Sequence, residues 1–380
     1  NETGHNPPLY FSQIPQTRLE DLAEDDSFMS HYNLVLERFN SEVRQGQDGN
    51  PHSTPPECIA YFSLEYGLHE SIKFYSGGLG CLAGDHLKES SDMDLPMFAV
   101  GLLYRCGYFQ QYLNSDGWQQ EACLINEIHH LPLKKACDNS HQQVKVSIPL
   151  PNGELHAIVW QLDVGRIPLY LLDTNIPENH TKQRNVAFQL YEADREVRLQ
   201  QEILLGIGGF RALLALGYNP AVCHMNEGHA AFVSLARMDH LMKSRNADIQ
   251  VAEEIVRRTN IFTTHTPVPA GNETFAVEPV KSYLSALQKE INIDPAKVVS
   301  WGRAPDKEHS HELVMTILAL RMSNYSNAVS KLHGGVTRRM WSHLWQGKPE
   351  NEIPITHVTN GVHTTSWLSQ DNVVLFDRYL

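Results

Sequence analysis

Short runs of β-branched and other apolar residues alternate with longer segments of helical periodicity from about residue 57 onward. This alternation is typical of βαβ units built around a mostly parallel sheet. It predicts strands at residues 59–64, 98–103, 221–225, 260–264 and 355–358. It predicts helices at residues 79–91, 185–216, 230–243 and 331–345.

A second pattern interrupts this alternation in the middle of the chain. Apolar runs at residues 144–150, 154–162 and 167–172 are separated by turn signals such as Pro-Asn-Gly at 151–153. Such spacing favours antiparallel pairing, so we expect a small antiparallel insertion there. The first 56 residues are expected to be helical and then loop-like at 46–56.

Charge and composition exclude several classes of function. The chain has 44 acidic and 31 basic side chains, a net charge of -13, whereas nucleic acids are bound by clustered Lys and Arg. No run of 18 apolar residues and no signal peptide is found in these 380 residues. We therefore expect a cytoplasmic protein with no nucleic-acid partner and no membrane span.

The cysteines are expected to be reduced and mostly buried. Their spacing is irregular, with no C-x-x-C pair, and disulfides are rare in cytosolic proteins of this size. The six positions are Cys58, Cys81, Cys106, Cys123, Cys137 and Cys223.

A glycine-rich loop follows the first predicted strand. The run YFSLEY at 61–66 ends near the carboxylate of Glu65, and SGGLG at 76–80 then opens a helix. Backbone N–H groups at a helix N-terminus attract anions, and glycine lets an anion come close. The loop is thus either a phosphate cradle or an ordinary turn before a helix.

Two other motifs are interpreted structurally. The glycines of GIGG at 206–209 lie inside a helical pattern, which indicates close helix packing and not a dinucleotide fingerprint. His224 and His229 are five residues apart with a glycine between them, which does not fit the H-E-x-x-H zinc motif. We predict no metal site.

Polar side chains follow several predicted strands or loops, at residues 224–229, 262–267, 327–333 and 358–363. Ligands of doubly wound sheets bind at the carboxyl ends of strands. Hydroxyl, amide and imidazole groups with few cations suit a neutral polyol such as a sugar.

Taken together, these segments resemble the glycogen, starch and maltodextrin phosphorylase family, and in particular its bacterial and archaeal α-glucan branch. The blocks that carry the resemblance cover nearly the whole chain. They are YFSLEY (61–66), SGGLG (76–80), DGWQ (116–119), VRLQQE (197–202), MNEGHA (225–230), THTPV (264–268), ALRMSN (319–324), VSKLHG (329–334) and TNGV (359–362).

The resemblance implies the first domain of a GT-B glycosyltransferase fold, in which two Rossmann-like domains face each other across a cleft. On that basis residues 57–375 are the Rossmann-like domain, 1–56 an extension packed on it, and 376–380 the start of a linker. The family holds pyridoxal phosphate on a lysine of the second domain, in a motif close to EASGTGNMK that this sequence does not contain. We expect an amino-terminal half that is inactive alone.

The resemblance also implies roles for individual residues near the phosphate. Gly77, Gly78 and Leu79 would offer backbone donors to it, and Glu65 and Tyr66 would line the cleft near the coenzyme.

On the sugar side, the resemblance implies that His265 contacts the reacting glucose and places a carbonyl near its developing positive charge. Asn360 and Val329 would contact the same glucose, and Glu227 and His229 would lie on the glucan-access side.

Asp194 belongs to a segment, residues 190–194, that resembles the gate loop of the family. We call it the gate segment.

The implied reaction is retaining phosphorolysis of terminal α-1,4 bonds, with α-1,4-glucan and inorganic phosphate as substrates and glucose 1-phosphate as product. Nothing in the sequence resembles the regulatory phosphorylation segment, so allosteric regulation is not expected. The oligomeric state stays open, a homo-oligomer included.

Three alternatives remain. A nucleotide-sugar glucosyltransferase resembling glycogen synthase would carry K-x-G-G-L-G, but Tyr75 occupies the lysine position. A glycoside hydrolase would need two facing carboxylates, such as Glu65 and Glu227, but would leave the glycine loop unexplained. A non-catalytic glucan-binding module is the third.

Overall fold

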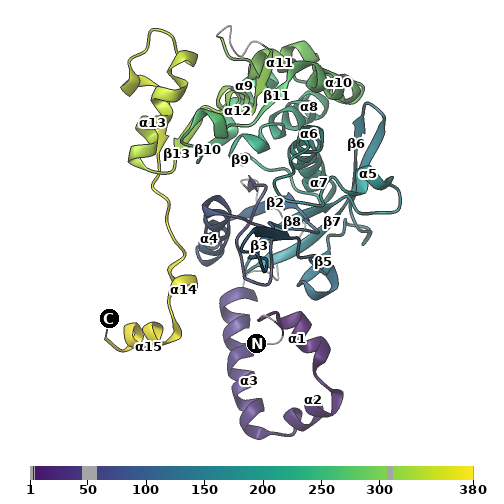
Figure 1. Ribbon diagram of the computed structural model, residues 1–380, viewed down its shortest axis with the longest axis vertical. Helices are drawn as coiled ribbons and strands as arrows, with labels where there is room; N and C mark the ends of the chain where they lie inside the picture. Colours follow the sequence, from purple (N-terminus) through teal and green to yellow (C-terminus); the bar gives the residue numbers. More distant parts are fainter. Residues whose placement is uncertain (1–2, 4, 45–57, 306–310, 380) are drawn as a thin grey trace.

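The computed structural model describes residues 3, 5–44, 58–305 and 311–379. Within these residues the chain forms a mixed α/β fold around a central, mostly parallel sheet with helices packed about it (Figure 1). The predicted domain boundary at 56/57 and the loop at 46–56 lie outside the described residues, as does residue 380. The predicted domain limits therefore stay predictions.

Ten described strands form the central sheet, and seven of them run parallel in the order β14-β13-β10-β9-β1-β2-β8. Their bounds are β1 Ile59–Phe62, β2 Met97–Leu102, β8 Ile167–Asp173, β9 Val222–Asn226, β10 Asn260–Thr264, β13 Tyr325–Ala328 and β14 Ile355–His357. The five strands predicted for this sheet are confirmed, with ends shifted by up to two residues. Strand β13 was missed because its sequence, YSNA, is short and polar.

The strand order reverses at β1. From β1 the chain proceeds to β2 and β8 on one side, and then crosses back to β9, which pairs with β1 on the other side. Where strand order reverses, loops at the carboxyl ends of the two neighbouring strands part and leave a crevice. The segments after β1 and β9 are YFSLEY and MNEGHA, so the topology places both at this crevice.

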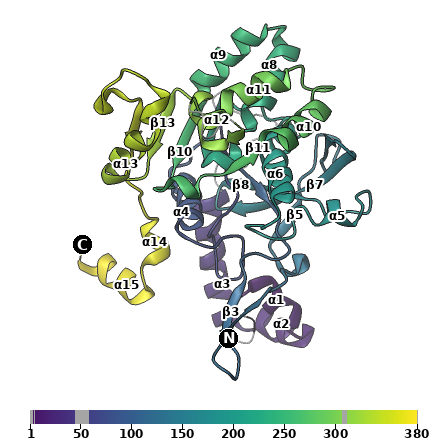
Figure 2. The same cartoon turned by 45° about the horizontal axis from the view of Figure 1, so that its top comes forward.

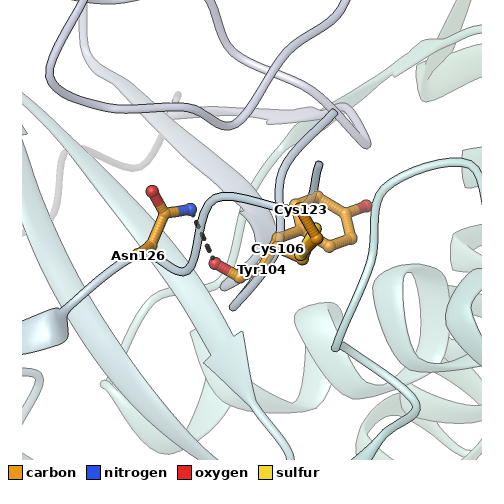
Figure 3. The surroundings of a disulfide bond; sticks show 4 residues. All are labelled: Tyr104, Cys106, Cys123 and Asn126. Carbon is orange, nitrogen blue, oxygen red and sulfur yellow. Dashed lines mark hydrogen bonds between the residues drawn. A yellow bond between two sulfur atoms is a disulfide. The ribbon is translucent and has the colours of Figure 1, made fainter. Parts of the chain in front are cut away.

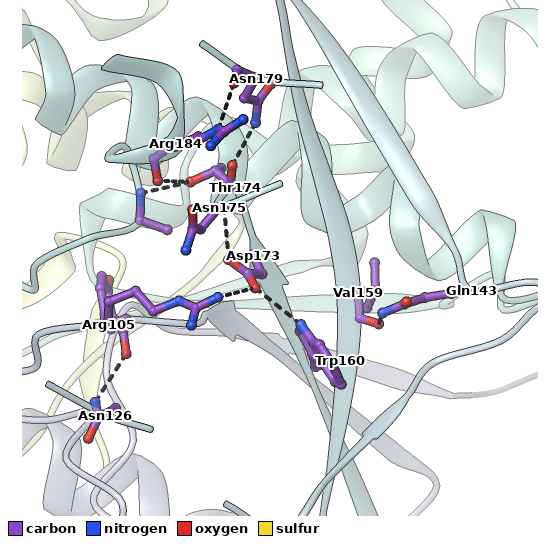
Figure 4. Close-up of polar contacts among 12 residues, drawn as sticks. Arg105, Asn126, Gln143, Val159, Trp160, Asp173, Thr174, Asn175, Asn179 and Arg184 are labelled. Atoms are coloured by element: carbon purple, nitrogen blue, oxygen red, sulfur yellow. Dashed lines mark hydrogen bonds and ion pairs between the residues drawn. The ribbon is translucent and has the colours of Figure 1, made fainter. Parts of the chain in front are cut away.

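The predicted antiparallel insertion is part of the same sheet. Strands β5 (Leu133–Lys135) and β6 (Lys145–Leu150) pair with β7 (Gly153–Val164), and β7 pairs antiparallel with β8. Because β8 also pairs parallel with β2, it joins the two regions. Figure 4 shows Asp173 at the end of β8 accepting hydrogen bonds from Arg105 (3.0 Å) and from Trp160 of β7 (3.3 Å).

Helices cover the sheet, as Figures 1 and 2 show from two directions. They are α4 Gly78–Asp92, α5 Thr181–Arg184, α8 Val233–Arg245, α9 Ile249–Thr259, α10 Val277–Leu287, α11 Pro295–Gly302, α12 Met315–Arg321 and α13 Lys331–Trp341. Two C-terminal helices, α14 Thr364–Trp367 and α15 Gln370–Tyr379, lie away from the sheet (Figure 1). Two short antiparallel pairs lie apart from the central sheet, β3 (Gln110–Leu113) with β4 (Gln119–Ala122) and β11 (Thr274–Ala276) with β12 (Glu312–Val314). No helix in the described ranges is long and apolar enough to cross a membrane.

The predicted helix at 185–216 is wrong in its first third. Residues 185–194 form turns and a bridge, and Asp194 then caps α6 (Arg195–Ile203) by accepting from the backbone of residues 196 and 197. A π-helical turn, Leu204–Gly208, joins α6 to α7 (Gly209–Ala215). A Cβ on Gly206 would stand 2.5 Å from the Val233 nitrogen, which confirms that these glycines serve close packing.

The N-terminal helices project from the rest of the molecule (Figure 1). They are α1 Pro7–Gln13, α2 Gln16–Ala23 and α3 Asp26–Phe39, and none of their described residues is buried. The helical prediction for this region is confirmed over these ranges.

A disulfide joins Cys106 and Cys123, with their Cα atoms 5.8 Å apart (Figure 3). This corrects the prediction of reduced thiols for that pair. The β3–β4 hairpin between the two cysteines returns the chain to its starting point, which their spacing in the sequence could not reveal. Cys58, Cys81, Cys137 and Cys223 are free, and Cys137 is exposed.

Candidate functional site

The glycine loop has open space around Gly77 and Gly78 and close packing around Gly80. Helix α4 begins at Gly78, and its N-cap, Gly77, provides no side chain to satisfy the first N–H groups. A Cβ on Gly77 or Gly78 would meet nothing within 4 Å. One on Gly80 would stand 2.4 Å from the Tyr75 Cβ and 2.7 Å from Glu65 Oε2. The loop thus offers free backbone donors and a partial positive charge to an approaching anion.

Glu65 holds this loop in place from the end of β1. Its buried carboxylate accepts from the backbone N–H of Ser76 (2.9 Å) and from the hydroxyl of Tyr191 in the gate segment. Glu65 therefore ties the glycine loop to the gate segment.

Tyr66 does not share this position. Its ring is 1% exposed, and its hydroxyl donates to the Val100 carbonyl at 2.8 Å. The Tyr66 side chain is therefore part of the core, and the position near the coenzyme that was predicted for this residue stays a prediction.

His265 follows β10, two strands from β1. Its ring Nε2 lies 2.7 Å from Asn226 Oδ1, and its backbone N–H donates to the Glu227 carboxylate. Burial lowers the pKa of His265, the charge of Glu227 opposes this effect, and His333 adds to it. The imidazole is therefore held mainly neutral.

The Glu227 carboxylate is occupied by the protein itself. It is 3% exposed and accepts from the backbone N–H of His265 and Thr266 (2.8 Å), and from the Thr264 hydroxyl (3.1 Å). Its second oxygen accepts from the Gly228 N–H at 3.2 Å. These contacts occupy most of the carboxylate, and the position on the glucan-access side that was predicted for Glu227 stays a prediction.

The backbone at Glu227 is strained. Its φ of 67° and ψ of 169° fall in a region populated almost only by glycine. Such strain costs about 1–3 kcal/mol and persists where surrounding contacts fix the residue. Here those contacts come from residues 264–266, so the carboxylate fixes the backbone around His265.

His229 lies near His265, on the turn that follows Glu227. Burial lowers its pKa well below the ordinary value, with Arg198 and His265 contributing in the same direction. Its Nδ1 is buried and has no partner among the described residues. The glucan contact predicted for His229 stays a prediction.

Arg198 of α6 connects the gate segment to β11. Its guanidinium lies 5.6 Å from the Tyr191 ring centroid, and its Nε donates to Glu273 Oε2 at 3.1 Å. Glu202 Oε1 is 3.5 Å from the same Nε, too far for a charge-assisted hydrogen bond. Burial consequently dominates at Glu202 and raises its pKa to about 8.

The remaining predicted residues fall into two groups. Asn360 donates its backbone N–H to the Val329 carbonyl at 3.0 Å, so the structure brings these two residues together after β14 and β13. The Asp194 carboxylate is exposed and engaged as the cap of α6. Sugar contacts for these three residues remain predictions.

A series of hydrogen bonds joins His265 to the backbone of Glu65, and the side chain of Glu65 continues the connection to the glycine loop. Beyond the His265–Asn226 contact, the Asn226 amide donates to the Ser63 hydroxyl at 3.1 Å, and that hydroxyl donates to the Glu65 carbonyl at 3.0 Å. Glu65 in turn holds Ser76. Sequence reasoning missed Ser63 and Asn226 as functional residues, although they lie in YFSLEY and MNEGHA, because a motif does not show which way a side chain points.

The segment after β14 is anchored to α4. Asp85 Oδ2 accepts from the His363 N–H (3.2 Å) and from the Trp367 indole (2.8 Å), and His363 Nε2 lies 3.0 Å from Asp92. These contacts hold residues 360–367 alongside the helix that begins at the glycine loop.

No group of three or more His, Cys, Asp or Glu side chains in the described ranges is arranged to hold a metal ion.

The fold and the site define a mixed α/β protein with a helix N-terminus that has no side-chain cap and a polar cluster at the carboxyl edge of a parallel sheet. Comparison with known proteins agrees with this class. Residues 192–379 match the profile of the carbohydrate phosphorylase family, and residues 1–72 match that of a protein of unknown function, DUF3417.

Several curated relatives align over almost the whole chain. Maltodextrin phosphorylase from Thermococcus litoralis is 41% identical over 99% of this chain and 44% of its own length. Glycogen phosphorylase from Mycobacterium tuberculosis is 40% identical over 96% of this chain and 44% of its own length. Glycogen phosphorylase from Aquifex aeolicus is 36% identical over 100% of this chain and 54% of its own length. On these matches the chain belongs to the carbohydrate phosphorylase family. It spans about half the length of these relatives.

Proposed function

We propose that this chain is the phosphate- and sugar-facing part of an α-glucan phosphorylase. The complete protein would transfer the terminal glucose of an α-1,4-glucan to inorganic phosphate with retention, giving glucose 1-phosphate. The observation that carries the proposal is the set of contacts that runs from His265 through Asn226, Ser63 and both the backbone and side chain of Glu65 to the loop before α4. It couples a polar, sugar-compatible side chain to an anion site.

The glycine loop fits the anionic side of this reaction. The first N–H groups of α4 have no side-chain cap, and the space above Gly77 and Gly78 is open. They would hold a phosphate group through backbone donors and the helix dipole. Pyridoxal phosphate, proposed for the complete protein, would supply a phosphate that exchanges a proton with the inorganic phosphate; no residue of this chain is assigned as its attachment point.

The polar strand ends fit the sugar side. Cleavage of the glycosidic bond develops positive charge on the sugar ring, which oriented dipoles stabilise. The Glu227 carboxylate fixes the backbone at residues 264–266, so the neighbouring carbonyl is preorganised. We also propose that residues 57–375 are the first Rossmann-like domain of a GT-B fold, with 1–56 an extension and 376–380 the start of a linker.

A pair of glycine variants of the complete protein tests the phosphate site. Gly78→Ala adds a methyl group where nothing lies within 4 Å, so the protein should melt as before but lose phosphate affinity about tenfold or more. Gly80→Ala, whose Cβ would meet Tyr75, should instead lower the melting temperature. The proposal fails if the complete protein shows no phosphate-dependent release of glucose 1-phosphate, or if Gly78→Ala keeps its affinity for phosphate.

His265→Ala tests the sugar side. A contact that strengthens in the transition state lowers kcat, whereas one made equally in the ground state raises KM alone. We expect a loss in kcat corresponding to about 2–4 kcal/mol, with glucan affinity changed less. Near-normal turnover in a folded variant would remove His265 from the catalytic residues.

A further inference from the structure

The His265 ring is held at the end of a short hydrogen-bonded relay. Its Nε2 faces Asn226 Oδ1 at 2.7 Å, and Asn226 Nδ2 faces the Ser63 hydroxyl at 3.1 Å. Asn226 and Ser63 are 1% and 0% exposed, so neither is exchanging partners with solvent. The relay crosses from β10 over β9 to the end of β1, at the place where strand order reverses.

The direction of the relay is set at Ser63. A hydroxyl carries a single proton, and the Ser63 hydroxyl donates it to the Glu65 carbonyl at 3.0 Å. It can therefore only accept from Asn226, which turns the Asn226 amide so that its NH₂ faces Ser63 and its oxygen faces His265. A carbonyl oxygen cannot donate, so the proton of this contact must reside on His265 Nε2.

We propose that Ser63 and Asn226 are positioning residues that fix the tautomer of His265, keeping the proton on Nε2 and leaving Nδ1 as a hydrogen-bond acceptor. Nδ1 makes no hydrogen bond to a described residue and is not among the enclosed unpartnered atoms. The ring can thus accept a hydrogen bond from a sugar hydroxyl through Nδ1. This last step rests on the proposed function, whereas the tautomer does not.

His224 provides an internal comparison on the neighbouring strand. Its Nε2 lies 2.8 Å from the Thr263 hydroxyl, which donates to Asn327 Oδ1 at 2.9 Å. The same reasoning places the proton of His224 on Nε2 through a separate relay. Burial lowers the pKa of His224 to about 3, so this ring stays neutral over the range of the experiment.

The test is nitrogen-15 NMR of the full chain with labelled histidine rings, recorded at a pH where His265 is neutral. The chemical shifts of Nδ1 and Nε2 show directly which nitrogen carries the proton. The His265 signals are assigned by their loss in His265→Gln. The wild type should show Nε2 protonated and Nδ1 unprotonated.

Ser63→Ala removes the group that sets the direction, so the Asn226 amide can rotate and a second population with Nδ1 protonated should appear. Ser63→Ala combined with Asn226→Asp should restore the single Nε2-protonated form, because a carboxylate can only accept. The matched control is Ser234→Ala, since the buried Ser234 hydroxyl also accepts from an asparagine amide, that of Asn260, at 3.1 Å. This control should leave His265 unchanged.

Unchanged His224 signals show that each variant is folded. The proposal is overturned if the His265 ring of the wild type is protonated on Nδ1, or if a folded Ser63→Ala keeps a single Nε2-protonated form. If Ser63→Ala does not fold, the tautomer of His265 in the wild type alone decides whether the proposal stands. In the complete protein, kcat of Ser63→Ala should fall by the share of molecules in the wrong tautomer, about two- to tenfold. Absence of phosphorolysis with the expected tautomers would reject the proposed function and leave the relay standing.

Discussion

Replacing Glu227 by glutamine tests the role of its carboxylate most directly. The substitution keeps the size and shape of the side chain but removes its charge and turns one acceptor into a donor. One carboxylate oxygen accepts three hydrogen bonds from residues 264–266, and the other accepts one from Gly228. In Glu227→Gln the first oxygen can stay in place, while an NH₂ group faces the Gly228 N–H.

The expected loss follows from these four contacts. A hydrogen bond to a charged group contributes about 1.5–3 kcal/mol and a neutral one about 0.5–1.5, so each of the three retained bonds weakens by roughly 1 kcal/mol. The buried Gly228 N–H loses its partner, at a cost of about 1–3 kcal/mol. The simple sum of these losses is about 4–6 kcal/mol. Because contacts that share one oxygen are not additive, we expect Glu227→Gln to lower the free energy of unfolding by at least about 3 kcal/mol.

Urea unfolding measures this loss, and Glu253→Gln is the matched control. The Glu253 carboxylate lies 3.3 Å from Lys297 with 22% of its side chain exposed, so its loss should cost less than about 1 kcal/mol. NMR titration adds a second observable. Because the Glu227 charge raises the pKa of His265, that pKa should fall further in Glu227→Gln. Equal stability of the two variants, or an unchanged His265 pKa, would refute a positioning role for Glu227.

Two further predictions concern the buried carboxyl of Glu202 and the Cys106–Cys123 disulfide. Burial raises the pKa of Glu202 from 4.5 to about 8, so the folded state binds the extra proton and stability falls as pH rises through this interval. Glu202→Gln should remove this pH dependence, so that the variant becomes more stable than the wild type as pH rises toward 8. At about 1.4 kcal/mol per pKa unit, the difference is at most about 5 kcal/mol. Urea unfolding at several pH values measures it, and a parallel pH dependence of wild type and variant would contradict the prediction. Cys123→Ser should cost about 3 kcal/mol under oxidising conditions, for the 17-residue separation closed by the disulfide. Cys137→Ser, at an exposed free cysteine, should leave the free energy of unfolding unchanged. Equal stability of Cys123→Ser and Cys137→Ser in the absence of reductant would show that the disulfide does not form.

The sequence predicted most reliably the strands and helices whose residues are nearly all buried or follow a regular apolar spacing. Strands such as Met97–Leu102 are almost entirely buried and show as continuous apolar runs. The helix predicted at 185–216 was too long because residues 185–190 include buried apolar side chains that fit helical spacing but pack in turns. Only the capping contacts of Asp194 reveal where the helix begins.

The sequence indicated which strand ends carry the candidate residues but not the contacts among them. Glu65, the glycine loop and His265 were identified because glycine and polar residues directly after apolar strands are typical of ligand-binding loops in parallel sheets. The direction of each side chain depends on tertiary packing. Tyr66 and Glu227 were therefore assigned to ligands, although one fills the core and the other binds backbone, whereas Ser63 and Asn226 were passed over.

The attachment of residues 363–367 to α4 has a mechanical consequence. The first turn of α4 presents the glycine loop, and Asp85 and Asp92, further along the same helix, hold His363 and Trp367. An α-helix is stiff along its axis, so a displacement of residues 363–367 would be transmitted along α4 to its first turn. The orientation of the first N–H groups of α4 is thereby linked to the position of a segment almost 300 residues away in the chain. If the glycine loop binds phosphate as proposed, strain applied at 363–367 would change phosphate affinity without altering the loop itself.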